Sequence, residues 1–338
     1  MNVGIVGGGN ISDTHARAAH AAGLRVAAVF GDNRAKARQL AERHGASAFD
    51  TLDAFLQQPS LDLVMIGSPS GCHAEHATAA VRARRHILVE KPLEISVERI
   101  DALLGEVARA GVVLGVFFQD RLKPDVVTMK RRIEAGDIGT PLVATGEVKW
   151  FRTPAYYADS RWRGSWSLAG GGALMNQGIH TVDLLLYLLG PVRSVSGLIA
   201  TRFHEIDVED TATAMIEFAS GALATVDATT AARPGQPRRL QIVGSAGSLL
   251  LEGDHLSELA GGRDPGQVVS EPRKSPESAA SPVVSDVAAH QRIIEDFVDA
   301  VRNGRAPVCD GREGRRSVEI IEAIYRSARE KRVIDVAL

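Results

Sequence analysis

Two separate groups of polar side chains in this sequence could carry acid–base chemistry. Lys91 stands between Glu90 and Pro92, and Asn176 and His180 follow a run of three glycines. An imidazole titrates near neutral pH, and a partly desolvated ammonium has a lowered pKa, so either group can exchange a proton with a substrate hydroxyl. A spacing of four residues places Asn176 and His180 on one face if both lie on one helical turn. We therefore predict that Lys91, His180 and Asn176 are the catalytic residues.

The N-terminal stretch has the pattern of a dinucleotide-binding turn. A short apolar strand at 3–6 leads into the loop GGGNIS at 7–12, and a helix-compatible segment follows at 13–22. In such a turn the first glycine permits the tight bend, the next lets the backbone approach a pyrophosphate, and the helix N-terminus binds the phosphates. We predict that this turn binds the cofactor through Gly7, Gly9, Asn10 and Ile11.

The end of the second strand, at 26–30, bears on the choice between NAD and NADP. An acidic residue there holds the ribose hydroxyls of NAD, whereas a nearby cation accommodates the 2′-phosphate of NADP. Gly31 follows the strand, Asp32 comes next, and Lys36 lies one helical turn further on. Asp32 favours NAD, whereas the missing acid at Gly31 and the presence of Lys36 favour NADP. The balance points slightly to NADP.

The rest of the first part alternates apolar strands with helices. Strands are expected at 61–66, 86–89 and 112–118, with helices between them. This alternation predicts a doubly wound parallel sheet, in which ligands bind beyond the carboxyl ends of the strands. We expect residues 1–120 to form this Rossmann domain. Residues that follow its strands are further candidates for cofactor binding: Ser68, Pro69, Ser70, His73, Glu90 and Gln119.

The second part, at 121–338, is expected to be an α+β domain for substrate binding and oligomerisation. Short turns predict a largely antiparallel open sheet with strands at 192–201, 211–218, 222–228, 239–243 and 248–252. Residues 261–286 are rich in glycine, proline, serine and charge, which is typical of a mobile loop. Aromatic and arginine side chains gather at 151–166 and suit the faces, hydroxyls or anionic substituents of sugars.

Composition argues against several other classes of protein. The formal net charge of −2 gives no support for a nucleic-acid partner. No apolar run approaches the length of a membrane span, and no secretory signal is visible. The two cysteines, Cys72 and Cys309, are too few for a disulfide framework and have no zinc-binding spacing. We expect a cytoplasmic protein that binds no metal ion, membrane or nucleic acid.

Three motifs together resemble those of the Gfo/Idh/MocA oxidoreductases, the family of glucose–fructose oxidoreductase and inositol dehydrogenase. They are the glycine loop, Glu90-Lys91-Pro92, and the sequence GGGALMNQGIHTVDLL at 170–185. The resemblance implies hydride transfer between NAD(P) and a hydroxyl or carbonyl group of a sugar, polyol or sugar derivative. It also implies a homodimer or homotetramer built on the open sheet. It implies that Trp162 and Arg163 lie near the substrate, and we also expect Arg121, Tyr156 and Asp183 to bind it.

In the mechanism that this resemblance implies, the nicotinamide lies between Lys91 and His180. His180 is the base, and Lys91 is its polarising partner. The chain departs from the commoner family pattern at Asn176, where an aspartate often stands. An ionised aspartate would raise the pKa of the histidine, whereas an asparagine can only orient the ring. We therefore expect His180 to be a weaker base and Lys91 to carry more of the proton transfer.

Two other functions are compatible with the same sequence. An NAD-dependent glycoside hydrolase would release its product without net reduction of the cofactor. A non-enzymatic sensor of sugars or dinucleotides could dispense with Lys91 or His180, and this chain retains both.

Overall fold

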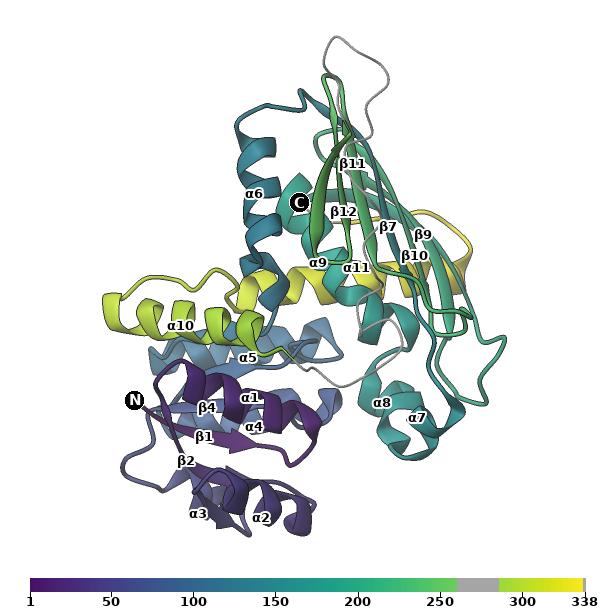
Figure 1. Cartoon of the computed structure of the whole chain (residues 1–338). Coiled ribbons are helices and arrows are strands. Elements are labelled where there is room, and N and C mark those ends of the chain that lie inside the picture. Colours follow the sequence, from purple (N-terminus) through teal and green to yellow (C-terminus); the bar gives the residue numbers. More distant parts are fainter. Residues whose placement is uncertain (260–285, 337–338) are drawn as a thin grey trace. The chain divides into compact units, whose positions relative to one another are not determined.

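The computed structural model of the chain describes residues 1–259 and 286–336 (Figure 1). The chain divides into two compact units, each discontinuous in sequence. Unit 1 comprises Met1–Gln119 and Val283–Val318, whereas unit 2 comprises Asp120–Pro282 and Glu319–Leu338. The stretch that we expected to be a loop at 261–286 lies outside the described residues except for its last member.

The C-terminal part of the chain contributes to both units. Helix α10 (Ala288–Asn303) belongs to unit 1 and packs against α1 (Asn10–Ala21), where the Gln291 side chain donates a hydrogen bond to Ala21 O. Helix α11 (Gly311–Glu330) begins in unit 1 and ends in unit 2. The observed units therefore differ from a simple division at residue 120, because the chain returns to the first unit through α10.

A six-stranded parallel sheet forms the centre of unit 1. Its strand order, β3-β2-β1-β4-β5-β6, is that of doubly wound nucleotide-binding folds, which confirms the predicted Rossmann fold. The strands are β1 (Asn2–Val6), β2 (Arg25–Phe30), β3 (Ser47–Phe49), β4 (Leu63–Ile66), β5 (His86–Val89) and β6 (Leu114–Val116). They are connected by helices α1, α2 (Arg34–Arg43), α3 (Leu52–Leu56), α4 (His73–Arg82) and α5 (Val97–Ala110).

Unit 2 is built on an eight-stranded sheet of order β13-β12-β11-β7-β10-β9-β8-β14. All its pairings are antiparallel except that of β7 with β10, so the predicted, largely antiparallel sheet is confirmed. The strands are β7 (Pro141–Lys149), β8 (Val192–Ala200), β9 (Thr211–Phe218), β10 (Leu223–Thr229), β11 (Arg239–Gly244), β12 (Ser248–Glu252), β13 (His255–Leu259) and β14 (Ile334–Asp335).

The helices of unit 2 cover one face of this sheet. Helices α6 (Pro124–Glu134) and α9 (Ile179–Leu189) and the end of α11 lie on that face (Figure 1). Helix α9 approaches β7 at Gly146, where a Cβ would stand 2.5 Å from Thr181 Cγ2. The end of α11 approaches β8 at Gly197, where a Cβ would stand 2.6 Å from Ile324 Cγ2. Helix α9 is consequently buried on most of its surface and is held firmly against the sheet.

The stretch between the glycines and α9 does not form an ordinary α-helical turn. Residues Ala173–Gly178 form a π-helical segment, η4, and α9 begins at Ile179. Widened turns of this kind are rare and occur frequently at functional sites. Because Asn176 lies in η4 and His180 lies in α9, their spacing of four residues does not by itself define a common helical face.

Within residues 1–259 and 286–336, no helix is both long enough and apolar enough to cross a bilayer.

Candidate active site

The glycine loop of unit 1 has the geometry that a pyrophosphate requires. Gly7 has a φ of +128°, and a Cβ there would stand 2.6 Å from Ser12 Oγ and 2.7 Å from Gly67 O, so only glycine fits. A Cβ at Gly9, by contrast, would meet no atom of the described residues within 4 Å. Gly9 is the N-cap of α1, and no described side chain caps this helix. The loop therefore leaves open backbone at a helix N-terminus, which is the usual setting for phosphate binding.

Hydrogen bonds join the carboxyl ends of β4 and β5 beside this loop. The ring of His73 bridges the two strand ends, with Nδ1 2.8 Å from Pro92 O and Nε2 2.8 Å from Ser68 O. His76 adds a contact of 2.9 Å between its Nδ1 and Ser68 Oγ. Ser68, Pro69, Ser70, His73 and Glu90 therefore lie along one edge of the sheet, and their contact with a cofactor stays a prediction.

Glu90 is buried beside Lys91 in a cluster of cationic and aromatic side chains. Its Oε1 lies 2.9 Å from His15 Nε2, and its Oε2 accepts a hydrogen bond of 3.0 Å from the backbone N–H of Lys91. The His15 ring stacks on Phe117 with a centroid distance of 4.2 Å. Burial alone would raise the pKa of Glu90, but the hydrogen bond with His15 and the charges of His15, His290 and Lys91 lower it to about 2. Glu90 is therefore ionised and anchors the backbone of Lys91.

This lowered pKa predicts that Glu90 contributes to stability in acid. The contribution is fully present above the ordinary carboxyl pKa of 4.5 and is lost as the pH falls toward 2. A shift of this size corresponds to about 3 kcal/mol of unfolding free energy. In denaturant titrations, Glu90→Gln should be less stable than the wild type near neutral pH, and the difference should shrink as the pH falls through this window. A difference that does not change with pH would contradict the role of the ionised carboxylate.

Gln119, which follows β6, presents a buried acceptor to the same edge of the sheet. Its Oε1 has no hydrogen-bond partner among the residues that the structure describes. Buried polar atoms are rarely left in this state, so a donor from a bound molecule would suit the position. Together with the open backbone at Gly9, this oxygen fits a dinucleotide that carries amide or hydroxyl donors.

Asp32 and Lys36 are exposed beyond the end of β2. Gly31 separates Asp32 from the strand and packs on the glycine loop, because a Cβ there would lie 3.3 Å from the carbonyl carbon of Gly7. Burial, followed by the negative charge of Asp32, raises the pKa of the Cys72 thiol after β4. The negative charge of Asp32 is therefore felt at Cys72, at the edge where the carboxyl ends of the strands lie.

In unit 2, Asn176 lies beside the aromatic and arginine cluster. The centre of this cluster is Tyr156 in α7 (Pro154–Ala158), whose hydroxyl accepts hydrogen bonds of 3.3 Å from Asn176 Nδ2 and Gln177 Nε2. The guanidinium of Arg163 lies 4.3 Å from the Tyr156 ring centroid and 5.5 Å from that of Trp162. The structure thus brings Tyr156, Trp162 and Arg163 together near Asn176. Aromatic faces next to polar edges suit a sugar ring.

A buried carboxylate holds the glycine turn that precedes η4. Glu209 accepts hydrogen bonds from the backbone N–H groups of Gly172 at 2.8 Å and Leu174 at 2.9 Å, and from the Tyr325 hydroxyl at 2.8 Å. Burial raises the pKa of Glu209 in spite of these bonds. A Cβ at Gly172 would collide with the carbonyl oxygen of Glu209, and one at Gly171 would collide with the Tyr325 hydroxyl. These two glycines therefore permit the close packing that fixes η4.

His180 faces a carboxylate from another element. Asp120, in the short helix η2 (Gln119–Leu122), has its Oδ2 3.8 Å from His180 Nδ1, and their side chains are only 7% and 14% exposed. Arg238 pairs with the same carboxylate, and Lys123 Nζ lies 2.8 Å from Asp120 Oδ1. Burial raises the pKa of Asp120, but the charges of Arg238, Lys123 and His180 hold it well below its ordinary value. An ionised, buried carboxylate therefore stands next to the imidazole.

Arg121 and Asp183, which we expected near the substrate, bind each other. Arg121 donates from Nε to Asp183 Oδ2 at 2.9 Å and from Nη2 to Oδ1 at 2.7 Å. Their side chains are 2% and 1% exposed. A buried bidentate pair of this kind fixes the elements that carry it, so the positions of these residues favour bracing of η2 against α9 over contact with a substrate.

Three buried residues that support these groups were not among the predicted site residues: His15, Asp120 and Glu209. Asp120 carried a usable signal, because it directly follows the strand-end residue Gln119. His15 lies in the buried part of a helix, and Glu209 precedes an alternating strand. Those two patterns do not distinguish a supporting carboxylate or imidazole from an ordinary polar residue.

Comparison with known proteins covers both parts of the chain. Residues 1–118 match the oxidoreductase family with an NAD-binding Rossmann fold, and residues 126–250 match the GFO/IDH/MocA C-terminal domain. The chain belongs to the Gfo/Idh/MocA family of oxidoreductases.

Relatives of this Gfo/Idh/MocA protein act on sugars and polyols. Levoglucosan dehydrogenase of Pseudarthrobacter phenanthrenivorans is 30% identical over 296 residues, which cover 77% of this chain and 75% of that protein. The scyllo-inositol 2-dehydrogenase (NADP(+)) of Bacillus subtilis is 28% identical over 305 residues, covering 86% and 83%. The crystal structure of the WlbA dehydrogenase from Bordetella pertussis, in complex with NADH and UDP-GlcNAcA, has a TM-score of 0.86 and 31% identity, covering 100% of this chain and 99% of that one.

These matches confirm the predicted family and class of enzyme. The Gfo/Idh/MocA protein is an oxidoreductase with an NAD-binding Rossmann fold, and its relatives are sugar and polyol dehydrogenases.

Proposed function

We propose that this oxidoreductase uses Lys91, His180 and Asn176 to transfer hydride between a nicotinamide dinucleotide and a sugar, polyol or sugar derivative. The observation that carries the proposal is that a buried carboxylate contacts each of the two acid–base residues. Glu90 anchors the backbone of Lys91, and Asp120 faces His180. Fixed acid–base groups are what proton transfer to or from a substrate hydroxyl requires.

In the oxidative direction, His180 takes the hydroxyl proton while Lys91 polarises the same oxygen. Asn176, held by Tyr156, orients the substrate beside the imidazole. When bound, the nicotinamide supplies the hydride acceptor. The aromatic faces of Tyr156 and Trp162 cover the sugar ring, and Arg163 binds a hydroxyl or an anionic substituent.

The cofactor would be held along the strand-end edge of unit 1. Backbone N–H groups at the start of α1 bind the phosphates, and the open approach at Gly9 leaves room for them. The other residues proposed to contact the cofactor are Gly7, Asn10, Ile11, Ser68, Pro69, Ser70, His73, Glu90 and Gln119.

The test is an absorbance assay of cofactor reduction. The full chain would be incubated with NAD or NADP and a panel of inositols, anhydrosugars and nucleotide-linked sugar acids. We expect substrate-dependent reduction of the cofactor with at least one member of the panel. Release of a sugar without net reduction would instead indicate a glycoside hydrolase. Binding of cofactor and sugar without any turnover would indicate a sensor.

We infer further that NAD is the preferred cofactor, although the sequence alone points slightly to NADP. Asp32 is the first residue after β2 that can carry a side chain toward the edge of the sheet, because Gly31 packs on the glycine loop. A carboxylate there would accept hydrogen bonds from the ribose hydroxyls and would repel a 2′-phosphate. Relatives of both kinds exist, since the Bacillus enzyme is named for NADP(+) and the Bordetella structure holds NADH.

This inference predicts the effect of removing the carboxylate. Asp32→Ser should change the ratio of kcat/KM for NAD to that for NADP by about tenfold in favour of NADP. A tenfold change corresponds to a loss of about 1.4 kcal/mol in the preference for NAD. Lys36→Ser, in the first turn of α2, should move the ratio in the opposite direction. If Asp32→Ser weakens the use of both cofactors equally, the carboxylate does not discriminate between them.

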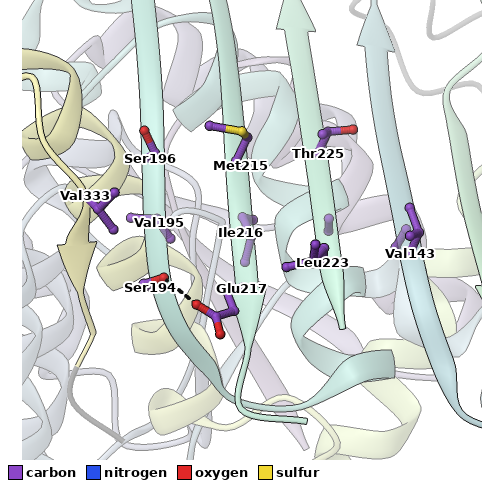
Figure 2. A pocket seen from close by; sticks show the side chains of 12 residues that line it. Val143, Ser194, Val195, Ser196, Met215, Ile216, Glu217, Leu223, Thr225 and Val333 are labelled. Carbon is purple, nitrogen blue, oxygen red and sulfur yellow. Dashed lines mark hydrogen bonds between the residues drawn. The ribbon is translucent and has the colours of Figure 1, made fainter. Parts of the chain in front are cut away.

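We propose that the face of the unit 2 sheet opposite α6 and α9 binds a second copy of the chain. Figure 2 shows a hollow on this face, lined by side chains from β7, β8, β9 and β10. Met215, Leu223, Val143 and Val333 are 60%, 55%, 48% and 57% exposed, and Leu223 lies beside Val143 in the register of β10 and β7. Apolar patches of this kind mark interaction surfaces, and a flat sheet face can pair with its own copy about a two-fold axis.

The proposed homodimer or homotetramer predicts a loss of association when charge is placed in the patch. Met215→Glu should lower the mass measured by light scattering at micromolar concentration. Val127→Glu is the matched control, because Val127 is 46% exposed on α6, which covers the opposite face of the sheet. An equal mass for both variants would refute this interface.

We also propose that the protein acts in the cytoplasm. Cys72 and Cys309 are both free thiols, which suits a reducing compartment.

A further inference from the structure

We propose that Asp120 is a positioning residue that supplies the carboxylate partner of His180, in the role that we assigned to an aspartate at position 176. This inference rests on the proposed function of His180 as the base. Asn176 is neutral, and its amide donates a hydrogen bond to Tyr156, so it cannot supply a negative charge to the imidazole. Asp120 reaches the ring from η2 instead, with its Oδ2 3.8 Å from Nδ1.

The position of Asp120 is fixed by the residue that follows it. Arg121 binds Asp183 through two hydrogen bonds of 2.7 and 2.9 Å. His180 and Asp183 are three residues apart in α9, so they lie on the same side of that helix. Two consecutive residues of η2 therefore meet two residues of α9 one turn apart. This double contact prevents η2 from sliding or turning relative to the imidazole, and it orients the carboxylate toward Nδ1.

The charges around Asp120 keep its carboxylate ionised without removing its effect on His180. Arg238 and Lys123 pair with it, and Asp254 lies 2.8 Å from Lys123 Nζ and 3.7 Å from Arg238 Nη2. Two carboxylates and two cations thus balance, so protonation of His180 adds one positive charge facing Asp120. The distance of 3.8 Å between Asp120 Oδ2 and His180 Nδ1 is too long for a hydrogen bond, so the influence of the carboxylate on the ring is electrostatic. A carboxylate at this distance favours the imidazolium, which makes His180 a stronger base than it would be without this charge.

The direct test measures the pKa of His180 in the full chain. Imidazole carbon–proton NMR signals would be titrated with pH, and the His180 signal would be assigned by its absence in His180→Gln. We expect Asp120→Asn to lower the pKa of His180 by about one unit, the low end of the usual effect of a neighbouring charge. Asp254→Asn is the matched control, because it removes an equal charge from the same two cations at a side chain that is 53% exposed. Asp254→Asn should lower the pKa of His180 by well under half of the shift expected for Asp120→Asn. Equal shifts in both variants, or none in Asp120→Asn, would overturn the proposal.

A second comparison covers the case in which Asp120→Asn does not fold. That variant leaves Arg238 and Lys123 without their buried counter-charge, whereas Arg238→Gln combined with Asp120→Asn removes both members of the pair. The pKa of His180 should be lower in this double variant than in Arg238→Gln alone. The same value in both would overturn the proposal.

Measurements of enzyme activity distinguish a failure of this inference about Asp120 from a failure of the proposed hydride-transfer function. The acid limb of the kcat/KM profile should move to lower pH in Asp120→Asn by the shift that NMR measures, since an imidazole with a lowered pKa stays deprotonated in more acidic solution. Asp120→Glu, which restores the charge, should return the limb toward its wild-type position. If the wild type transfers no hydride, the proposed function fails and the NMR shift still stands. If the wild type is active but Asp120→Asn changes neither the pKa nor the profile, this inference alone fails.

Discussion

Replacing Lys91 or His180 by alanine should lower kcat for hydride transfer by roughly 10²- to 10⁴-fold, the usual contribution of a general acid–base group. The backbone of Lys91 is anchored by the buried Glu90 carboxylate, and His180 faces Asp120 from the first turn of a buried helix. The proposed mechanism places neither side chain at the phosphates of the cofactor. The dissociation constant for NAD(H), measured by fluorescence titration, should therefore change little in either variant.

Two exposed residues of the same types provide controls for these losses. Lys331→Gln and His20→Gln change side chains that lie on the surface, and both variants should keep wild-type kcat. Full activity in Lys91→Ala or His180→Ala would remove that residue from the proposed mechanism. A loss of cofactor affinity that accounts for the whole effect would reassign it to binding.

Gly172→Ala should destabilise the fold by about 3 kcal/mol or more, the upper range for overpacking in a close-packed interior. The added Cβ would collide with the Glu209 carbonyl oxygen and would stand 3.0 Å from Val208 Cγ2. The Glu209 backbone cannot move away easily, because its carbonyl accepts a hydrogen bond of 2.9 Å from Ala173 N and its carboxylate holds Gly172 N. Denaturant titration should show the loss as a lower midpoint.

Gly9→Ala is the matched comparison, with the opposite expectation. A Cβ at Gly9 would meet no described atom within 4 Å, and the backbone there is extended, so the change in stability should stay within about 1 kcal/mol. The new methyl group would instead occupy the approach of the pyrophosphate and weaken cofactor binding. The account of the two glycine turns would be wrong if Gly9→Ala destabilised the fold more than Gly172→Ala, or if it bound NAD(H) as tightly as the wild type.

Strands that are marked by a run of apolar residues could be predicted from the sequence. Strands and turns that depend on contacts with distant residues could not. The buried parallel strands β1, β4 and β5 are continuous apolar runs bounded by glycine or charged residues, so their pattern suffices. The short strands β3 and β14 have no such run, because three or two residues paired at a sheet edge need no apolar pattern. The π-helical turn at Ala173–Gly178 depends on packing of glycines against Glu209 and Tyr325, which lie far away in the sequence.

The same distinction holds for the candidate site. Strand-end residues such as Ser68, Glu90 and Gln119 could be selected because parallel strands deliver their carboxyl ends to one edge. The role of Arg121 and Asp183 could not be predicted, because an arginine and an aspartate 62 residues apart give no sign that they bind each other. Asp120 could have been selected as a strand-end residue because it follows Gln119, but its closeness to His180 could not be predicted, since it arises only when η2 packs on α9.

Transfer of deuterium is the most direct test of the central claim that this chain moves hydride between a sugar or polyol and a nicotinamide. A substrate identified in the reduction assay would be labelled with deuterium at the carbon that bears the reacting hydroxyl, and the reduced cofactor would be analysed by mass spectrometry. The account predicts one deuterium in each reduced nicotinamide formed by the wild type, and almost no labelled cofactor from Lys91→Ala or His180→Ala. Product formed without deuterium in the cofactor, or labelling that persists at the wild-type rate in both variants, would contradict it.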